Sequence, residues 1–277
     1  MTFAQQTYVP DDTFENTLIN LGYDNVLDDY VATANINTVT SLGLYYWNIA
    51  DLTGIEAFTA LTALYIQGTQ LTSLDVSSNT ALTYLNCYNN QLTSIDISGA
   101  TALTLLNIYD NQLNSLDVSQ NTALTVLDCT VNQLTSLDVS SNTALIDLFC
   151  DDNQLTSLDV STNTALTYFY CTDNQLTSLD LRNGNNTNMM GFDATDNPNL
   201  TCIDVNDPTW STANSTNIDS QHYYSNNCGT TAIQEHTTNK ELLKVTDLLG
   251  RETPYKKNTA LFYIYDDGAV EKKIIIE

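Results

Sequence analysis

The chain has 277 residues, of which 42% are hydrophobic, and it carries 33 acidic against 8 basic residues, for a net charge of −25. This hydrophobic content is enough for a sizeable core and excludes a disordered chain. The acidic excess repels phosphate, which makes nucleic acid and anionic lipid poor partners, and no apolar run approaches the ~18 residues of a membrane-spanning helix.

The start of the chain suggests export. Residues 1–4 resemble the last residues of a secretory signal, which ends at the small residue Ala4 before Gln5. We interpret them as the remnant of a signal peptide whose upstream part is missing. An ordinary cytosolic start is the alternative that so short a segment leaves open.

Residues 5–38 predict an N-terminal cap. Asp12, with Glu15 three residues later, predicts a capping box at the start of a short amphipathic helix that ends near Gly22. A solenoid of repeats exposes apolar side chains at its first turn. We expect this helix to cover them.

Internal repeats occupy residues 39–205. Residues 71–175 read as five units of 21 residues, beginning with LTSLDVSSNTALTYLNCYNNQ and LTSIDISGATALTLLNIYDNQ. Each unit contains L-x-x-L-x-[L/I/C]-x-x-N-x-L, and its central alternation predicts a short strand with the apolar members pointing inward. One unit cannot bury its own leucines, but stacked units share a continuous core.

Asparagines recur as two ladders. The first lies at the turn after the strand, where an amide that both donates and accepts can satisfy buried backbone groups. Its members are Asn90, Asn111, Asn132, Asn153, Asn174 and Asn197. The second serves the opposite bend through Asn79, Asn121, Asn142 and Asn163, and Ala100 interrupts it.

This pattern resembles leucine-rich repeats, most of all those of the internalin group and its 21-residue class with cysteine in place of one leucine. The resemblance covers about residues 39–205. It implies a leucine-rich-repeat solenoid, a curved right-handed superhelix with a parallel β-sheet on the concave face. Such proteins usually act as recognition scaffolds and seldom as enzymes.

Four of the six cysteines share one repeat position, which Ile108 fills in the remaining unit. They are Cys87, Cys129, Cys150 and Cys171. Cysteine and isoleucine replace each other at a small inward site, so we interpret the four as a ladder of free, buried thiols. Spacings of a whole repeat or more do not supply the close ligands of a metal site.

Of the other two cysteines, Cys202 lies in the last repeat turn, LTCIDV, and Cys228 lies near the end of the polar segment that follows it. Residues 206–231 are expected to cap the end of the solenoid with little core of their own. A disulfide between Cys202 and Cys228 would stabilise this cap by about 3 kcal/mol in the chain-entropy model. Two free thiols are the alternative.

Two sets of acids are candidates for calcium. Asp24, Asp28 and Asp29 lie in the N-terminal cap, but they lack the spacing and central glycine of an EF-hand loop. A ladder at the second bend comprises Asp75, Asp96, Asp117, Asp138, Asp159 and Asp180. Solvated carboxylates with local hydrogen bonds are the favoured interpretation of both sets. No metal ligand or cofactor is therefore assigned, and calcium is the alternative.

The outward positions of the concave strands vary from turn to turn. Their aromatic residues are Tyr45, Tyr65, Tyr84, Tyr88, Tyr109, Phe149, Tyr168 and Tyr170, and the interleaved acids are Asp110, Asp128, Asp147, Asp151, Asp152, Asp173 and Asp193. Exposed aromatic rings on a rigid sheet supply contact area at low entropic cost. We predict that the eight aromatic residues bind a ligand together with Asp128, Asp147 and Asp151. The alternative is that the rings only stabilise the sheet.

Residues 232–277 form a module of different composition, with eight acids and seven bases against 25 acids and one base, Arg182, in residues 1–231. Strands are expected at 242–249, 261–265 and 270–276, with a turn at 266–268. The stretches DLLGRE, FYIYDDG and KKIIIE resemble the C-terminal sorting domain of type IX secretion cargo. That resemblance implies export across an outer membrane, and a plain β appendage is the alternative.

From the sequence we expect a monomeric recognition protein that is secreted or held at the outer-membrane surface of a Gram-negative bacterium. Its concave face would bind a protein or glycan, and its tail would meet the type IX export machinery. A structural or matrix protein with calcium-assisted self-association is the alternative, and a glycan-processing enzyme is a third. No catalytic residue is assigned: His222 and His236 have no evident catalytic partner in the sequence, and repeated carboxylates offer like environments where an acid and a base need unlike ones.

Overall fold

The computed structural model describes residues 5–45, 48–228, 242–246, 251–253, 261–265 and 270–273. The chain divides into two compact units, residues 1–228 and 229–277, which are described separately. The signal remnant at 1–4, the turn at 266–268, the last residues of KKIIIE and the histidine at 236 lie outside the described residues. In the described part no helix is long and apolar enough to cross a bilayer.

The N-terminal cap combines a small antiparallel sheet with two helices. Strand β1 (Gln6–Tyr8) pairs with β2 (Tyr30–Ala32), and the helices are α1 (Asp12–Asn20) and α2 (Thr33–Ile36). Phe14 and Leu18 of α1 are fully buried, and Phe14 stacks on Phe58 of the repeats at a ring-centroid distance of 6.4 Å. The helix therefore covers the first turn of the solenoid, as the apolar spacing predicted.

The predicted capping box is wrong by one residue. Asp11, not Asp12, caps α1, because its Oδ1 accepts from the backbone N–H groups of Thr13 and Phe14, each at 2.9 Å. Glu15 does not reach back to the cap. Its buried carboxylate accepts from the backbone of residues 28–30, at 3.0–3.2 Å, and so fixes the loop that leads into β2.

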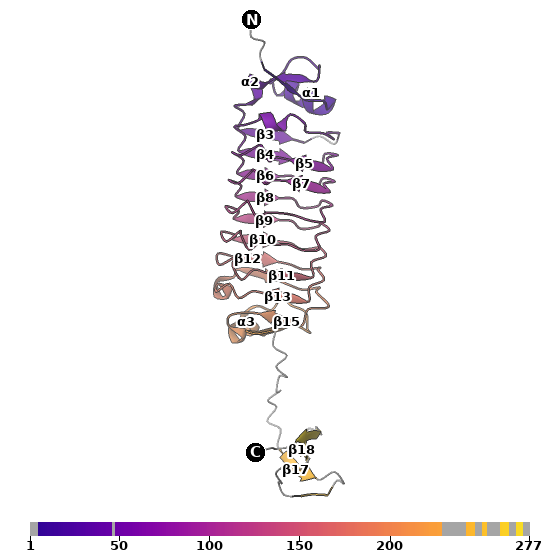
Figure 1. Ribbon diagram of the computed structural model, residues 1–277, viewed down its shortest axis with the longest axis vertical. Coiled ribbons are helices and arrows are strands. Elements are labelled where there is room, and N and C mark those ends of the chain that lie inside the picture. Colours follow the sequence, from indigo (N-terminus) through magenta and orange to yellow (C-terminus); the bar gives the residue numbers. More distant parts are fainter. Residues whose placement is uncertain are drawn as a thin grey trace. The chain divides into compact units, whose positions relative to one another are not determined.

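An eight-stranded parallel sheet forms one side of the solenoid, and its strands are stacked in chain order (Figure 1). They are β3 (Ser41–Leu44), β4 (Ala63–Ile66), β6 (Tyr84–Asn86), β8 (Leu105–Asn107), β9 (Val126–Asp128), β10 (Asp147–Phe149), β12 (Tyr168–Tyr170) and β14 (Gly191–Asp193). Residues one repeat apart are paired, as in Leu85–Leu106 and Leu106–Leu127, so each central leucine stacks on the next inside the core. The middle residue of each of these strands from β6 onward is buried, while its first and third residues are outward and partly exposed.

The second side of each turn is less regular. Two strands pair there near the N-terminus, β5 (Ser73–Asp75) and β7 (Ser94–Asp96), and four more form a sheet near the C-terminal cap. These four are β11 (Ser157–Asp159), β13 (Ser178–Asp180), β15 (Cys202–Asp204) and β16 (Tyr223–Ser225). Short 3-10 helices lie at Ile55–Ala57 and Asn186–Asn188, and helix α3 (Pro208–Asn214) closes the C-terminal end.

Both asparagine ladders hold neighbouring turns together. In the first, Asn132 Oδ1 accepts from the Leu113 N–H at 3.0 Å, and Nδ2 donates to the carbonyls of Ile108 and Cys129, each at 3.1 Å. In the second, Asn142 Nδ2 donates to two carbonyls of the preceding turn, while its buried Oδ1 has no partner in the described part. The first ladder thus satisfies both donors and acceptors, and the second satisfies acceptors only.

A left-handed backbone position precedes each asparagine of the first ladder. The φ angles there are positive, from 49° to 56°, at Asn89, Asp110, Val131, Asp152, Asp173 and Asp196. Gly68, which precedes Thr69 at the same position of the first turn, has a φ of 63°. Glycine, asparagine and aspartate tolerate this conformation, whereas a β-branched residue does not. Val131 is therefore the one member of this column that strains its backbone.

We expect Val131→Asn to stabilise the repeat domain by about 1 kcal/mol, because the left-handed conformation costs other L-residues ~1–2 kcal/mol. Thermal unfolding followed by circular dichroism measures the change. The reverse substitution at the equivalent position two repeats earlier, Asn89→Val, is the matched control and should lower the melting temperature. A lower melting temperature for Val131→Asn would show that the valine contributes packing that outweighs its strain.

The second unit is a three-stranded antiparallel sheet. Its strands are β17 (Leu242–Thr246), β18 (Leu261–Tyr265) and β19 (Val270–Lys273), in the order β17-β18-β19. Glu252 adds an isolated antiparallel bridge to Thr246. Residues 242–246 and 270–273 of the first and last expected strands are strand, and the remaining residues of both lie outside the described part.

Candidate functional site

The eleven predicted ligand-binding residues lie on the outward side of the eight-stranded sheet, which we call the sheet face. It corresponds to the expected concave face. First strand positions carry Tyr84, Asp147 and Tyr168, and third positions carry Tyr65, Asp128, Phe149 and Tyr170. Tyr45, Tyr88, Tyr109 and Asp151 lie two residues beyond the third position. The parallel register brings residues from distant turns into rows.

The first group of these residues is a cluster of tyrosines over β3 to β8. Tyr65 and Tyr84 pack with their ring centroids 4.9 Å apart. Tyr88, four residues after Tyr84, is half-buried. Tyr45 and Tyr109 are more open, with 57% and 39% of their surface exposed. This tyrosine cluster offers flat apolar surface with hydroxyl groups and contains no charged residue.

The second group mixes aromatic residues with acids over β9 to β12. Phe149 pairs in register with Asp128 on one side and with Tyr170 on the other, where the ring centroids are 5.4 Å apart. Asp147 and Asp151 lie two residues before and after Phe149. We call Asp128, Asp147, Phe149, Asp151 and Tyr170 the acidic–aromatic cluster.

Burial dominates the electrostatics of this cluster. It raises the pKa of the carboxyls of Asp128, Asp147 and Asp151 above the ordinary value. Hydrogen bonds from Thr130 to Asp128 and from Thr172 to Asp151 oppose the shift, with Thr172 N at 2.8 Å. Asp147 Oδ1 is buried and has no partner among the described residues. These carboxylates are therefore held on the sheet face at a cost in free energy.

Two expectations about this surface need correction. Most of the tyrosines do not stand free in solvent, because Tyr65 packs on Tyr84 and five of the seven are half-buried. In addition, Asp110, Asp152 and Asp173 are not members of the strand rows. They occupy the left-handed turn position after the strand, where aspartate is favoured for its backbone conformation.

A cavity of about 270 Å³ lies where the sheet face meets the C-terminal cap. Its lining includes Tyr170, Met190, Gly191, Phe192 and Trp210. A Cβ at position 191 would come within 2.6 Å of the Tyr170 hydroxyl and 2.7 Å of the Tyr168 ring, so glycine makes room for both tyrosines. Sequence reasoning missed this hollow, because half of its wall comes from α3 and the segment after it, outside the repeat pattern.

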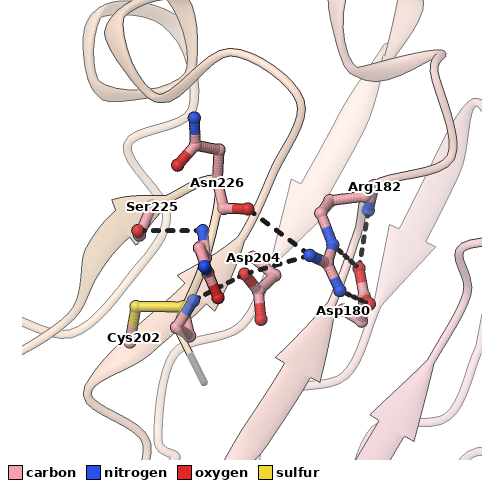
Figure 2. Close-up of a disulfide and its surroundings, with 8 residues drawn as sticks. Asp180, Arg182, Cys202, Asp204, Ser225 and Asn226 are labelled. Carbon is pink, nitrogen blue, oxygen red and sulfur yellow. Dashed lines mark hydrogen bonds and ion pairs between the residues drawn. A yellow bond between two sulfur atoms is a disulfide. The ribbon is translucent and has the colours of Figure 1, made fainter. Parts of the chain in front are cut away.

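The C-terminal cap is fixed to the solenoid by a covalent bond and by the single base of residues 1–231. The predicted disulfide between Cys202 and Cys228 is present. Figure 2 shows Arg182 beside it, reaching between Asp180 and Asp204 and donating to the carbonyl of Asn226. Asp204 in turn accepts from the Cys228 N–H at 2.8 Å. Arg182 is thus committed to the cap and is not available to the sheet face.

The other four cysteines are free and buried in the core. Burial raises the pKa of the Cys87 thiol to about 12, and it also raises the pKa values of the Cys129, Cys150 and Cys171 thiols above the ordinary value. A thiol that stays protonated at neutral pH is a poor nucleophile and a poor metal ligand. This environment suits a packing role.

The aspartate ladder of the second bend has a local structural role. Each carboxylate accepts from the N–H two residues later, for example Asp138 from Ser140 and Asp159 from Ser161, at 2.8–3.0 Å. Hydrogen bonds of this kind hold the pKa of Asp96, Asp117 and Asp138 below the ordinary value. Such turns account for an aspartate in every repeat without a ligand.

Carboxylates that approach one another closely occur in the N-terminal cap. Among the described residues, two sets have ligand atoms within 4.8 Å: Asp12, Glu15 and Asp29, and Glu15, Asp24 and Asp28. Glu15 is common to both, and its two oxygens already accept three backbone N–H bonds. Closure of the cap loop accounts for this arrangement.

Comparison with known proteins identifies the fold. The family described as the Endo-beta-N-acetylglucosaminidase EndoS LRR domain matches residues 34–142. Internalin J of Listeria monocytogenes serotype 4b is 35% identical over 72 residues, which are 26% of this chain and 8% of that protein. The chain therefore spans only a small part of that relative's length.

The solved structure of an internalin supports the same fold. Internalin C2 of Listeria monocytogenes is 20% identical, and the match covers 81% of this chain and 99% of that one with a TM-score of 0.58. The functional domain of InlJ from the same species, which includes a cysteine ladder, is 24% identical over 74% of this chain and 68% of that one, with a TM-score of 0.40. The chain has the leucine-rich repeat fold of the internalin-like type, which confirms the predicted fold class.

Proposed function

We propose that this protein is a recognition protein, secreted or held at the cell surface, that binds a protein or glycan partner on its sheet face. The observation that carries the proposal is the contrast between the two sides of the repeat. At the second bend the same aspartate and asparagine recur for structural reasons, whereas on the sheet face the outward residues change from strand to strand. Rigid rows of tyrosine and aspartate are suited to contact with a partner.

Non-enzymatic function is part of the proposal. A catalytic carboxylate pair needs an acid and a base in unlike environments. Burial raises the pKa of all three carboxyls of the acidic–aromatic cluster, so none of them is the low-pKa partner that such a pair requires. His222 is buried in the C-terminal cap, where its ring contacts the Asp219 N–H and the Asn197 carbonyl, so it serves as a structural link. These features favour binding over turnover.

Export is the second part of the proposal. The Cys202–Cys228 disulfide supports maturation in an oxidising compartment. The small antiparallel β unit from 242 onward supports a module separate from the repeats. We propose that this unit is a type IX sorting domain and that the protein reaches the outer-membrane surface of a Gram-negative bacterium.

Deletion of residues 232–277, with a full signal peptide supplied, should leave the repeats folded and retained in the periplasm.

The sheet face is tested by replacing Tyr84, Tyr109 and Tyr168 together with alanine. On an array of glycans and surface proteins the unchanged protein should give a defined set of binders, and the triple variant should lose them by more than tenfold in affinity, as expected for the loss of several aromatic contacts. Because Tyr84 packs on Tyr65, a modest fall in melting temperature is also expected.

The matched control replaces three exposed glutamines of the turns, Gln91, Gln112 and Gln175, with alanine. It changes the same number of side chains off the sheet face and should keep full binding. Unchanged binding by the tyrosine variant, with a large fall in its melting temperature, would show that the tyrosines only pack the sheet.

A further inference from the structure

The acidic–aromatic cluster surrounds one aromatic ring with negative charge. Phe149 has Asp128 beside it on the preceding strand and Tyr170 on the following one. Strands lie ~4.8 Å apart, and residues two apart on a strand are separated by ~7 Å, which places Asp147 beside Phe149 along β10. Asp151 follows in the turn after β10, where its Oδ1 accepts from the Thr172 N–H of the next turn at 2.8 Å. Three carboxylates and a second ring therefore border Phe149.

The repeat domain has no counter-charge for these carboxylates. Arg182, the only lysine or arginine in residues 1–231, is bound to Asp180 and Asp204 at the second bend. Among the described residues, Asp128 accepts from Thr130 and Asp151 accepts from Thr172, both of them neutral, and Asp147 Oδ1 accepts no hydrogen bond. Partly buried anions without a cation destabilise a free protein, and they gain most when a partner supplies one.

We propose that the acidic–aromatic cluster binds an arginine or lysine side chain of a partner protein, which lies over the Phe149 ring between Asp128, Asp147 and Asp151. This inference rests on the proposed function and names the chemistry of the partner. A guanidinium group can stack on the ring while its N–H groups donate to carboxylates at the edge, so arginine is the better fit of the two.

The same geometry disfavours a metal ion in this place. An ion such as calcium needs six or more oxygen ligands at 2.3–2.6 Å, whereas here a phenyl ring lies among the carboxylates. The groups of carboxylates that come within 4.8 Å of one another in the described residues do not include Asp128, Asp147 or Asp151. An apolar floor with an acidic border instead matches a cationic side chain on an aliphatic stem.

The test measures binding of a short labelled peptide of alternating glycine and arginine to the full chain at physiological ionic strength. Phe149→Leu and Asp147→Asn should each weaken binding about fivefold, the equivalent of ~1 kcal/mol for a lost cation–π or ion-pair contact. Phe149→Tyr keeps an aromatic ring and should retain affinity. The counterpart peptide with citrulline in place of arginine should not bind.

The matched control is Asp138→Asn, which removes the same charge from the exposed bend. It should leave affinity within a factor of two. An equal loss for Asp138→Asn and Asp147→Asn would show attraction to the overall charge and overturn the proposal, as would full binding by Phe149→Leu.

Stability gives an independent readout, because the substitution that weakens binding, Asp147→Asn, is expected to stabilise the fold. Because burial raises the pKa of Asp147, its charge destabilises the folded state above that pKa and has no effect below the unfolded pKa. Asp147→Asn should therefore raise the melting temperature at pH 7 and leave it unchanged near pH 3. A lower melting temperature at pH 7 would mark Asp147 as a structural residue.

The outcome is separable from that of the proposed function. If the array yields partners whose binding depends on Tyr84, Tyr109 and Tyr168 but not on Phe149 or Asp147, the proposed recognition function is supported and the proposed cation site is overturned. If no partner depends on any residue of the sheet face, the proposed function itself is overturned.

Discussion

Asn132→Ala is expected to lower the free energy of unfolding by about 3 kcal/mol, because a buried group left without its partner costs ~1–3 kcal/mol and this side chain serves several. Its Oδ1 accepts from the Leu113 N–H, and its Nδ2 donates to the carbonyls of Ile108 and Cys129. The loss spans two successive turns of the solenoid. Urea unfolding followed by circular dichroism measures it.

Asn142→Ala is the matched control from the second ladder. The side chain of Asn142 only donates, and its buried Oδ1 is unpaired in the described part. Removing the side chain also removes the desolvation cost of that oxygen, which offsets part of the loss. The expected loss is about 1 kcal/mol. Ala100 occupies this ladder naturally, which agrees with a smaller cost. Equal losses for the two variants would contradict the view that the acceptor role of the first ladder makes the difference.

Gly99→Ala is expected to destabilise the second repeat by about 3 kcal/mol, at the upper end of the range for overpacking. A Cβ at this position would lie 1.7 Å from the Ser77 carbonyl oxygen, which is backbone and cannot rotate away. If the bend were loose, the same change would stabilise the protein by ~0.4–1 kcal/mol by restricting the unfolded chain. The sign of the effect therefore decides whether the turns are in contact here.

The neighbouring Ala100 gives a physical reason for the close approach. Elsewhere in this ladder an asparagine side chain lies between successive bends, as when Asn121 donates to Ile97 and Ala100 of the turn before. Alanine supplies no such side chain, so the close approach of the Gly99 and Ser77 backbones meets no obstacle here. The double variant Gly99→Ser with Ala100→Asn restores the usual pair and should recover most of the stability lost in Gly99→Ala. A double variant less stable than the single one would show that the two positions are independent.

The fold was predictable from the sequence because the same local pattern of apolar residues recurs in every unit, and each recurrence supports the same stacked arrangement. A leucine at the second strand position buries its side chain only if the next turn supplies another, as in Leu85, Leu106 and Leu127, and five aligned units leave one way to satisfy them all. The cysteine ladder and the Cys202–Cys228 bond follow from the same logic, since a repeated position indicates packing and an isolated pair indicates a bridge.

Details that depend on contacts between turns were not readable in the same way. Aspartate at 110, 152 and 173 looks like part of an acidic surface in the sequence, yet its backbone conformation explains it. The capping role of Asp11 over Asp12 depends on a second set of donors, Ala50 and Asp51, which only the packed first repeat brings within reach.

The sequence by itself determined the solenoid, its register and the outward residues of the strands, because a period of 21 fixes which side chain repeats on which face. Only the tertiary structure decided which of those residues act together. It separated the tyrosine cluster from the acidic–aromatic cluster, paired Phe149 with Tyr170 at 5.4 Å, and buried the carboxylates around them. The reason is physical: ring packing and desolvation arise between strands, from neighbours that lie a full turn away in the chain.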